Sequence, residues 1–391
     1  MQKEQVLFAL LRNIVCGQPV SEDTKAACTT EMLEHVYALA SRHDLAHLVA
    51  QAANKLELPQ SEFLKKCDQS AKQAIFRYLR LSNAYEQICG TLEKAEIPFI
   101  PLKGSVLRDF YPEPWMRTSC DIDILVKAEH LESAIASIKE ELQYADGPKG
   151  DHDVSLFSAA GIRLELHYDT LAENSAINES YAVLSRIWET AIPKQPGMYQ
   201  CELTDAMFYF YHIAHMAKHF QIGGCGIRPF LDLWILNHRV QCDVQARRQL
   251  LAQGGLLAFA EAAEKLSETW FSGAPMDSMT DQLARYIFSG GVYGTMENNV
   301  AMQQQKQGGK LQYALSKIIL PYETIKFHYP VLQKHKWLTP CYQVVRWFKL
   351  LFKGGVKRSV KQLRLNATAS REEIQSTQIL LQYMGLKQPE K

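Results

Sequence analysis

The sequence predicts an α+β protein in which a small mixed β-sheet lies between N-terminal and C-terminal helical regions. Three observations support this prediction. Apolar residues recur at a spacing near 3.6 through residues 1–95, as in amphipathic helices. Strand-like runs are confined to residues 97–168. After Ser175 the helical spacing returns, with glycine- and proline-rich breaks.

We expect four regions along the chain. Residues 1–95 form a helical N-terminal region, and residues 96–170 form the core that carries the sheet. Residues 171–320 form a helical region that packs on this core, and residues 321–391 form a basic helical C-terminal region. A chain of 391 residues is long enough to bury a core of this size.

The overall composition is that of a soluble globular protein. Apolar residues make up 47% of the chain and charged residues 22%, both ordinary values for this class. No apolar run approaches the roughly eighteen residues that a membrane-spanning helix needs. The nine cysteines are scattered and never form a Cys-x-x-Cys pair, which argues against a disulfide framework or a zinc ribbon. We therefore expect a cytoplasmic protein without a transmembrane segment.

Basic residues are concentrated near the C-terminus. Between Thr324 and Arg371 the sequence has eleven lysines and arginines and no aspartate or glutamate, whereas the net charge of the chain is only +1. Aromatic and apolar residues alternate with the cations, as in Val344 to Lys353. This pattern suits an anionic partner of segment 324–371, either RNA or a membrane surface. A solvated helix face with an apolar underside is an equally good interpretation.

The core region begins with a strand pattern, Ile97 to Leu102, that leads into Lys103, Gly104 and Ser105. The apolar spacing from Ser105 to Tyr111 predicts a short helix. Glycine lets a backbone approach a ligand closely, and the N–H groups of such a turn can bind phosphate oxygens. The segment is therefore a candidate phosphate-binding turn.

Asp121 and Asp123 belong to the apolar run Asp121–Val126, which is typical of a buried strand. Residues two apart on a strand share a face, so the two carboxylates would repel each other unless a cation lay between them. Carboxylate oxygens suit Mg²⁺ or Mn²⁺, which also bind substrate phosphates. Asp-x-Asp is common by chance, but following a phosphate-binding turn it favours phosphoryl or nucleotidyl transfer.

The rest of the core completes the predicted sheet. A helix is expected over residues 128–142 and a polar loop over residues 145–150. Residues 153–157 are expected to form one strand of a hairpin that turns at residues 159–161. A second Asp-x-Asp, at positions 151 and 153, lies in a polar context and is interpreted as loop.

Residues 162–168 alternate between apolar and polar side chains, as a half-buried strand should. Leu164 and Leu166 would face the core. Glu165 and His167 would share the opposite face, where Glu165 is a candidate partner for the two aspartates.

These residues resemble the nucleotidyltransferase superfamily typified by DNA polymerase beta. In that superfamily an apolar-Gly-Gly/Ser turn precedes an Asp-x-Asp/Glu strand, and a third carboxylate follows on a neighbouring strand. More narrowly, the chain resembles a bacterial family known only as uncharacterised nucleotidyltransferases. The residues that carry this resemblance are Leu102, Lys103, Gly104, Leu107, Tyr111, Arg117 and Asp121 to Val126. It covers residues 96–170, and a weaker resemblance continues to His215, His219, Arg228 and Asp232.

The resemblance implies a transferase that moves NMP from an NTP donor to an acceptor. Its catalytic residues, which would also hold Mg²⁺ or Mn²⁺, would be Asp121, Asp123 and Glu165. The residues expected to bind the nucleotide are Lys103, Gly104, Ser105 and Arg117. Residues expected near the site, supporting it without taking part directly, are His167, His215, His219 and Asp232.

The acceptor stays open: a small molecule, a protein or RNA would all serve. A toxin-type enzyme that modifies tRNA or protein would use the same carboxylates, and a non-catalytic helical scaffold that only binds nucleotide is a further alternative. His215 and His219 have the i, i+4 spacing of a metal pair. Because no glutamate follows His215, an interior polar network or a substrate contact is the favoured interpretation of this pair.

Overall fold

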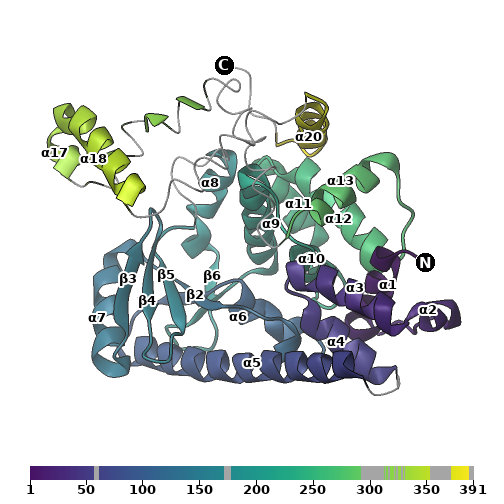
Figure 1. The fold of residues 1–391 in the computed structure, drawn as a ribbon. Helices are drawn as coiled ribbons and strands as arrows, with labels where there is room; N and C mark the ends of the chain where they lie inside the picture. The colour runs from purple at the N-terminus through teal and green to yellow at the C-terminus, as the bar shows by residue number, and fades with distance from the viewer. Residues whose placement is uncertain are drawn as a thin grey trace.

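The computed structural model describes residues 1–56, 61–170, 178–291, 331–352 and 371–386, with isolated positions between 312 and 329. A five-stranded mixed sheet lies beside a larger helical body, and the long helix α5 (Glu62–Lys94) runs beneath both (Figure 1). The predicted α+β class is therefore confirmed. The division into four regions remains a prediction.

The sheet contains every strand of the predicted core. Its strands, in the spatial order β1-β2-β5-β4-β3, are β1 (Phe99–Pro101), β2 (Asp121–Val126), β5 (Arg163–His167), β4 (Asp153–Phe157) and β3 (Ala145–Lys149). The central strands β2 and β5 are parallel and the other neighbours are antiparallel. In the β2–β5 register Asp123 lies opposite Glu165. Two acidic positions that are distant in sequence are thus brought together.

One face of the sheet packs on helices α5 and α7 (Leu131–Leu142). Ile122, Ile124 and Val126 of β2 are fully buried there. Leu164 and Leu166 of β5 are fully buried as well, which confirms that these leucines face the core. Because side chains alternate between the two faces of a strand, the acidic positions of both strands point away from this core.

Two expectations for the core were wrong and one was confirmed. Residues 145–150, expected as a loop, contribute strand β3 at the edge of the sheet. Its mostly exposed side chains leave no burial pattern to read, and an edge strand tolerates Pro148. Asp153 was expected both in a polar loop and as the first residue of the strand over 153–157. It begins β4 opposite His167, so only its loop interpretation was wrong. The expected hairpin between β4 and β5 is confirmed, and its turn is closed by the bond from the Ser158 N–H to the Ile162 carbonyl.

The region after Ser175 is mainly helical, as expected, but it also contains a small hairpin. Strands β6 (Ala191–Pro193) and β7 (Cys201–Leu203) pair antiparallel, and they are too short to give a periodic pattern. The described helices between residues 178 and 291 are α8 (Asn178–Leu184), α9 (Asp205–Ile222), α10 (Arg228–His238), α11 (Val244–Gln253), α12 (Leu257–Phe271) and α13 (Ser278–Ser289).

The N-terminal helices share one hydrophobic core with these later helices. They are α1 (Lys3–Leu11), a π-helical turn (Arg12–Cys16), α2 (Glu22–Ala27), α3 (Thr30–Arg42) and α4 (Ala46–Lys55). Phe8 of α1 stacks on Trp270 of α12, with ring centroids 4.8 Å apart. Hydroxyl side chains cap three of the early helices: Ser21, Thr29 and Ser61 each accept a backbone N–H of the first turn. Residues 1–56 and 61–95 contain no strand within the described positions, as predicted.

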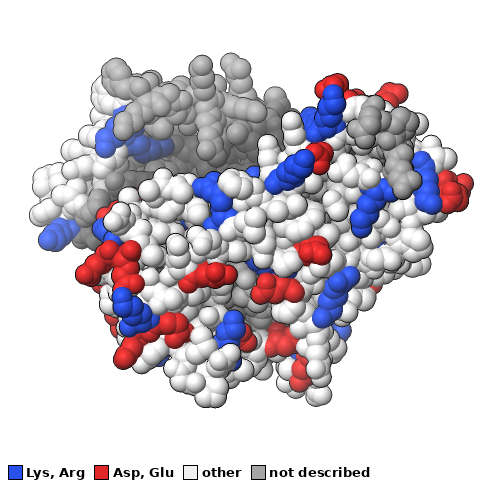
Figure 2. Space-filling view, turned by 90° about the horizontal axis from the view of Figure 1, so that it is seen from below, with Lys and Arg blue, Asp and Glu red and all other residues white. Residues whose placement is uncertain are grey.

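The C-terminal part of the described chain comprises α17 (Val331–Lys334), a 3₁₀ turn (Lys336–Leu338), α18 (Thr339–Phe352) and α20 (Arg371–Tyr383). The basic segment 324–371 therefore lies only partly within the described residues. None of the described helices combines the length and apolarity needed to cross a membrane. Acidic and basic side chains are interspersed over the face seen from the side of α5 (Figure 2).

Candidate active site

The turn between β1 and β2 places Lys103, Gly104 and Ser105 beside the acidic strand. A short helix, α6 (Gly104–Leu107), starts at this glycine and continues as a 3₁₀ turn (Arg108–Phe110), close to the helix expected from Ser105 to Tyr111. A Cβ added to Gly104 would lie 3.1 Å from the Ser119 Cβ and 3.7 Å from Nη1 of Arg117. Glycine is therefore favoured by close packing of the turn.

Lys103 reaches from this turn to the carboxylates. Its backbone has φ of +48°, a conformation that typically costs a non-glycine residue about 1–3 kcal/mol. Its Nζ lies 2.7 Å from Oδ1 of Asp123, and this aspartate side chain is only 5% exposed. The strained backbone thus accompanies a buried ion pair on the candidate catalytic strand.

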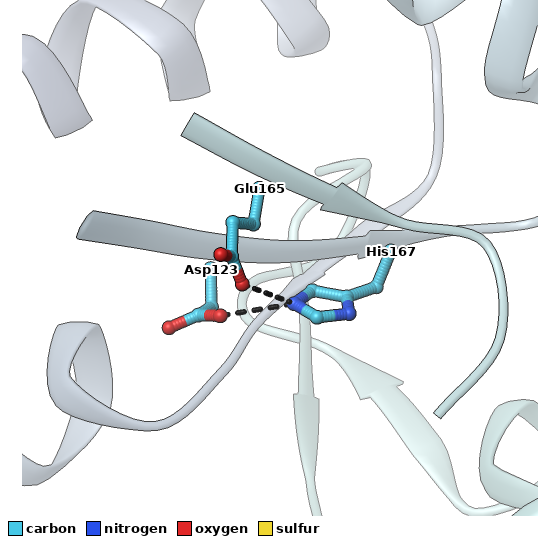
Figure 3. A group of neighbouring side chains, drawn as sticks. All are labelled: Asp123, Glu165 and His167. Atoms are coloured by element: carbon cyan, nitrogen blue, oxygen red, sulfur yellow. Dashed lines mark hydrogen bonds and ion pairs between the residues drawn. The ribbon is translucent and has the colours of Figure 1, made fainter. Parts of the chain in front are cut away.

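Asp123, Glu165 and His167 form a compact polar cluster on this face of the sheet (Figure 3). The His167 Nε2 lies 2.9 Å from Oδ1 of Asp123 and 3.5 Å from Oε2 of Glu165. One ligand atom of each residue lies within 4.8 Å of those of the other two. Arg163 also pairs with Glu165, at 2.7 Å. Neighbouring parallel strands therefore hold two carboxylates and an imidazole in one group.

The charges of this cluster shift its pKa values in opposite directions. Burial alone would raise the pKa of Asp123, but the Lys103 ammonium and the hydrogen bond from His167 hold it below its ordinary value. Burial alone would lower the pKa of His167, but its hydrogen bonds to Asp123 and Glu165 raise it. Asp123 is thus kept ionised by two groups that a bound cation would compete with.

Asp121 lies at the start of the same strand, opposite Arg163. Burial raises its pKa, and the negative charges of Asp123 and Glu165 raise it further. The expected ligand set of Asp121, Asp123 and Glu165 is thus close enough for mutual repulsion. The compact cluster of Asp123 and Glu165 contains His167 as its third member, whereas Asp121 was the third member expected from the sequence.

Arg117 and Asp232 form a second buried ion pair. Nε of Arg117 lies 2.6 Å from Oδ1 of Asp232, and the two side chains are 8% and 1% exposed. The same carboxylate accepts a hydrogen bond of 2.7 Å from the Tyr111 hydroxyl, and Nη1 of Arg117 donates to the Thr118 carbonyl. Arg117 therefore joins helix α10 to the segment before β2, and its expected contact with nucleotide remains a prediction.

Helix α9 carries the histidines that the sequence singled out. Nε2 of His215 and Nε2 of His219 lie 3.2 Å apart, and His212 contacts the Pro229 carbonyl at 3.1 Å. Burial lowers the pKa of His219 to about 4, with the positive charge of Lys103 as the next cause. The pKa of His215 is lowered for the same two reasons. The two histidines therefore form a neutral pair near Lys103.

The structure adds residues that sequence reasoning missed. Tyr211 and Lys218 lie on α9 at spacings of four and three from His215, so all three share one helix face. The charges of Lys103, Asp123 and Glu165 act on the Tyr211 hydroxyl, whose pKa is raised mainly by burial. Nζ of Lys218 lies 3.2 Å from Nε2 of His152. The only sequence signal for this face of α9 was the i, i+4 and i+7 spacing of Tyr211, His215 and Lys218.

Arg108 is a further residue that the sequence did not single out. Its Nε donates to the Gly104 carbonyl at 2.9 Å, and its Nη2 donates to the Ser119 hydroxyl at 3.0 Å. The Ser105 N–H donates to the Leu102 carbonyl at 3.2 Å. Side chain and backbone bonds together fix the turn next to the carboxylates.

Comparison with known proteins places this arrangement in a family. No curated protein matches the chain. The model of a family described as an uncharacterised nucleotidyltransferase matches residues 30–272. The match includes the turn at Gly104, the carboxylates on β2 and β5, and the whole of α9, and it covers more than half of the chain. The chain therefore belongs to this family of uncharacterised nucleotidyltransferases.

Proposed function

We propose that this protein is a divalent-metal-dependent nucleotidyltransferase that moves NMP from an NTP to an acceptor hydroxyl. The observation that carries the proposal is the pairing of Asp123 with Glu165 on adjacent parallel strands. Asp121 adds a third carboxylate whose pKa is raised by burial and by those two charges. Three carboxylates this close favour a multivalent cation.

The donor atoms fit the metal that such a reaction uses. Asp121, Asp123 and Glu165 would hold Mg²⁺ or Mn²⁺ through carboxylate oxygens, which both ions prefer. The bound metal would activate the acceptor oxygen and neutralise charge on the phosphates. His167, 2.9 Å from Asp123, would orient the carboxylates, or would become a nitrogen ligand if Mn²⁺ is bound.

The turn beside the carboxylates would bind the donor. The Gly104 N–H and the Ser105 hydroxyl would contact the β- and γ-phosphates, because the Ser105 N–H already donates to the Leu102 carbonyl. Lys103 would move its ammonium from Asp123 to the phosphates once a metal neutralises that carboxylate. Arg117, held by Asp232 next to Gly104, would support the turn and add positive charge.

The proposed transfer is an in-line displacement at the α-phosphorus. The acceptor oxygen forms a bond to the α-phosphorus as the bond from that phosphorus to the pyrophosphate oxygen breaks. The hydroxyl proton passes to a carboxylate of the cluster, and pyrophosphate leaves with the bonding electrons. His215 and His219 would line the acceptor side of this site from helix α9.

Incubation with each α-labelled NTP, Mg²⁺ and a cell extract tests the proposal. We expect label to be transferred to a discrete fraction, with release of pyrophosphate, and the transfer to stop when EDTA is added. The fraction that gains label separates a small-molecule acceptor from the toxin-type alternative, in which tRNA or protein would be labelled. Stoichiometric nucleotide binding without transfer would contradict the proposal and favour the non-catalytic scaffold.

A further inference from the structure

His152 and Lys218 meet on the far side of the carboxylates from the Gly104 turn. The turn follows β1, whereas His152 immediately precedes β4. In the order β1-β2-β5-β4, the acidic strands β2 and β5 lie between these two positions. The His152 ring lies 5.9 Å from the His167 ring, between centroids. The carboxylates thus have a phosphate-binding turn on one side and a nitrogen cluster on the other.

The Lys218 ammonium of this nitrogen cluster forms no direct ion pair with a described carboxylate. Lys218 donates to Nε2 of His152 at 3.2 Å, and none of the described carboxylates lies within 4.0 Å of its Nζ. Nδ1 of His152 is buried without a hydrogen-bond partner in the described part of the chain. Asp153 is the nearest acidic neighbour, 4.0 Å from His152. An ammonium and an imidazole that converge in this way are suited to an anion.

The electrostatics of the cluster agree with this geometry. Burial lowers the pKa of His152 to about 4, and the positive charge of Lys218 lowers it further. Burial also lowers the pKa of Lys218, followed by repulsion from Lys103, although Asp153 and Glu165 oppose the shift. An anion bound against Lys218 and His152 would oppose both shifts.

We propose that His152 and Lys218 bind an anionic group of the acceptor, a phosphate or a carboxylate. This inference rests on the proposed function, because it assigns the Gly104 turn to the donor and the opposite side to the acceptor. An acceptor anchored beyond His167 would present its hydroxyl to Asp123 and Glu165, between its own anion and the donor phosphates. The acceptor class is therefore a hydroxyl compound or chain end that bears an acidic group.

Inorganic phosphate and acetate are the probes that test this subsite. Their binding is measured by calorimetry with Mg²⁺ and a saturating non-hydrolysable NTP analogue already present. We expect at least one probe to bind in addition to the analogue, and the better probe to identify phosphate or carboxylate as the anchor. Lys218→Met and His152→Ala should each weaken that binding at least tenfold and leave analogue affinity within about twofold. Lys194→Ala, on the exposed β6–β7 hairpin, is the matched control and should bind as wild type does.

The outcomes separate this inference from the proposed function. Displacement of the analogue by phosphate would overturn the inference, because the nitrogens would then belong to the donor site. Absence of binding by both probes, or equal binding by wild type and both variants, would also overturn it. Failure of the analogue to bind in the presence of Mg²⁺ would instead count against the proposed function. His152→Ala alters a loop residue, so it provides a readout even if Lys218→Met perturbs α9.

A second inference comes from the surface of α18 and the turn before it. Exposed apolar side chains recur at helical spacing and form what we call the α18 stripe, which consists of Trp337, Cys341, Val344, Val345 and Phe348. Trp337 is 75% exposed and Phe348 is 57% exposed. Gln343, in contrast, is only 7% exposed and bonds to the Leu320 backbone. The helix thus presents its apolar side outward and a polar residue inward, unlike an ordinary solvated helix.

Cations border the α18 stripe. Lys334, Lys336 and Lys349 are exposed beside it, and the sequence from Thr324 to Arg371 has no acidic residue. An exposed aromatic stripe flanked by lysines is typical of a helix that lies in the plane of an anionic membrane. A nucleic acid would match the cations but would leave the aliphatic part of the stripe without a partner.

We infer that the α18 stripe docks on an anionic lipid surface. The full-length protein should co-sediment with phosphatidylglycerol vesicles and at least tenfold less with phosphatidylcholine vesicles. Trp337→Ser combined with Phe348→Ser should reduce sedimentation at least tenfold. Phe76→Ser, which removes a 63% exposed phenylalanine from α5, is the matched control and should sediment as wild type. Equal binding to both lipids, an unaffected double variant, or binding to an RNA oligonucleotide in place of vesicles would overturn this inference.

Discussion

Asp123 and Asp232 are both buried carboxylates, yet their surroundings differ in a way that separates chemistry from architecture. Asp123 is 4% exposed and Asp232 is 1% exposed. Each is paired with one cation, Lys103 or Arg117, at 2.7 Å and 2.6 Å respectively. The cations lower the pKa of both carboxyls against the effect of burial. By burial and pairing alone, the two sites would look alike.

Their neighbours distinguish them. Asp232 receives a planar guanidinium and the Tyr111 hydroxyl, groups whose geometry fixes a joint between elements. Asp123 receives a lysine ammonium and an imidazole, and a second carboxylate, Glu165, lies beside it. Excess negative charge next to an exchangeable cation is what a metal site requires. A buried ion pair is therefore functional evidence only when further like charges accompany it.

The largest expected effect concerns catalysis. Asp123→Asn should reduce metal-dependent nucleotide transfer at least about a thousandfold, because it removes a charge that the metal and transition state need. Asp151→Asn changes the exposed second Asp-x-Asp and should retain activity within about twofold. Initial rates with labelled NTP measure both. Full turnover by Asp123→Asn would show that the first motif is no more catalytic than the second.

The next effect concerns stability. Asp232→Ala should lower the free energy of unfolding by about 3–5 kcal/mol, because Arg117 would be left buried and unpaired. Chemical denaturation followed by circular dichroism measures the change. The double variant Arg117→Met with Asp232→Leu should recover at least half of the loss, since no buried charge then remains unpaired. If Asp232→Ala were as stable as wild type, the Arg117–Asp232 pair would have no role in stabilising the fold.

A third buried polar side chain, His43, shows what happens without any partner. Its ring is fully buried, and neither nitrogen has a hydrogen-bond partner in the described structure. Burial lowers its pKa to about 4, followed by repulsion from Arg42. The unfolded chain, with an ordinary pKa near 6.5, binds protons first, so stability is full above about pH 6.5 and decreases as the pH falls toward 4.

Replacement of His43 measures this dependence. As the pH falls over that range, His43 should lower the free energy of unfolding by about 3 kcal/mol, at about 1.4 kcal/mol for each unit of pKa difference between the folded and unfolded chain. His43→Leu should therefore lose less stability than wild type between pH 7.5 and pH 4, as measured by denaturation at both values. His35→Leu, on the exposed side of the preceding helix α3, should follow the wild-type curve. Parallel curves for wild type and His43→Leu would show that His43 is hydrated or paired.

The smallest effect tests whether a metal ion can displace the Lys103 ammonium from Asp123. Lys103→Met should bind Mn²⁺ about tenfold more tightly than wild type in the absence of nucleotide, because Asp123 loses a competing cation. The same variant should bind the NTP analogue about tenfold more weakly, because the phosphates lose a positive charge. Titrations monitored by Mn²⁺ paramagnetic resonance and by calorimetry provide the two values. Weaker binding of both ligands would instead indicate that Lys103 is a purely structural cation.

Local patterns predicted much of the sheet and the acidic part of the site. The period of two in β2 and β5 was sufficient to place Asp123 and Glu165 on the face opposite Leu164 and Leu166. The same patterns could not reveal β3. The side chains of this edge strand are mostly exposed, so its sequence shows no alternation of buried apolar and exposed polar residues. The partner of Arg117 lies 115 residues away in sequence, and His152 is 66 residues from Lys218. Such contacts depend on how helices pack over the sheet and leave no local signal.

The most direct test of the central claim is anomalous diffraction from crystals grown with Mn²⁺ and a non-hydrolysable NTP analogue. We predict anomalous peaks about 2.0–2.2 Å from carboxylate oxygens of Asp123 and Glu165, with Asp121 joining them and the analogue phosphates at Gly104. Lys103 should have left Asp123. Manganese bound only between His215 and His219, or a retained Lys103–Asp123 pair with no metal beside it, would contradict the assignment of these carboxylates as the catalytic metal site.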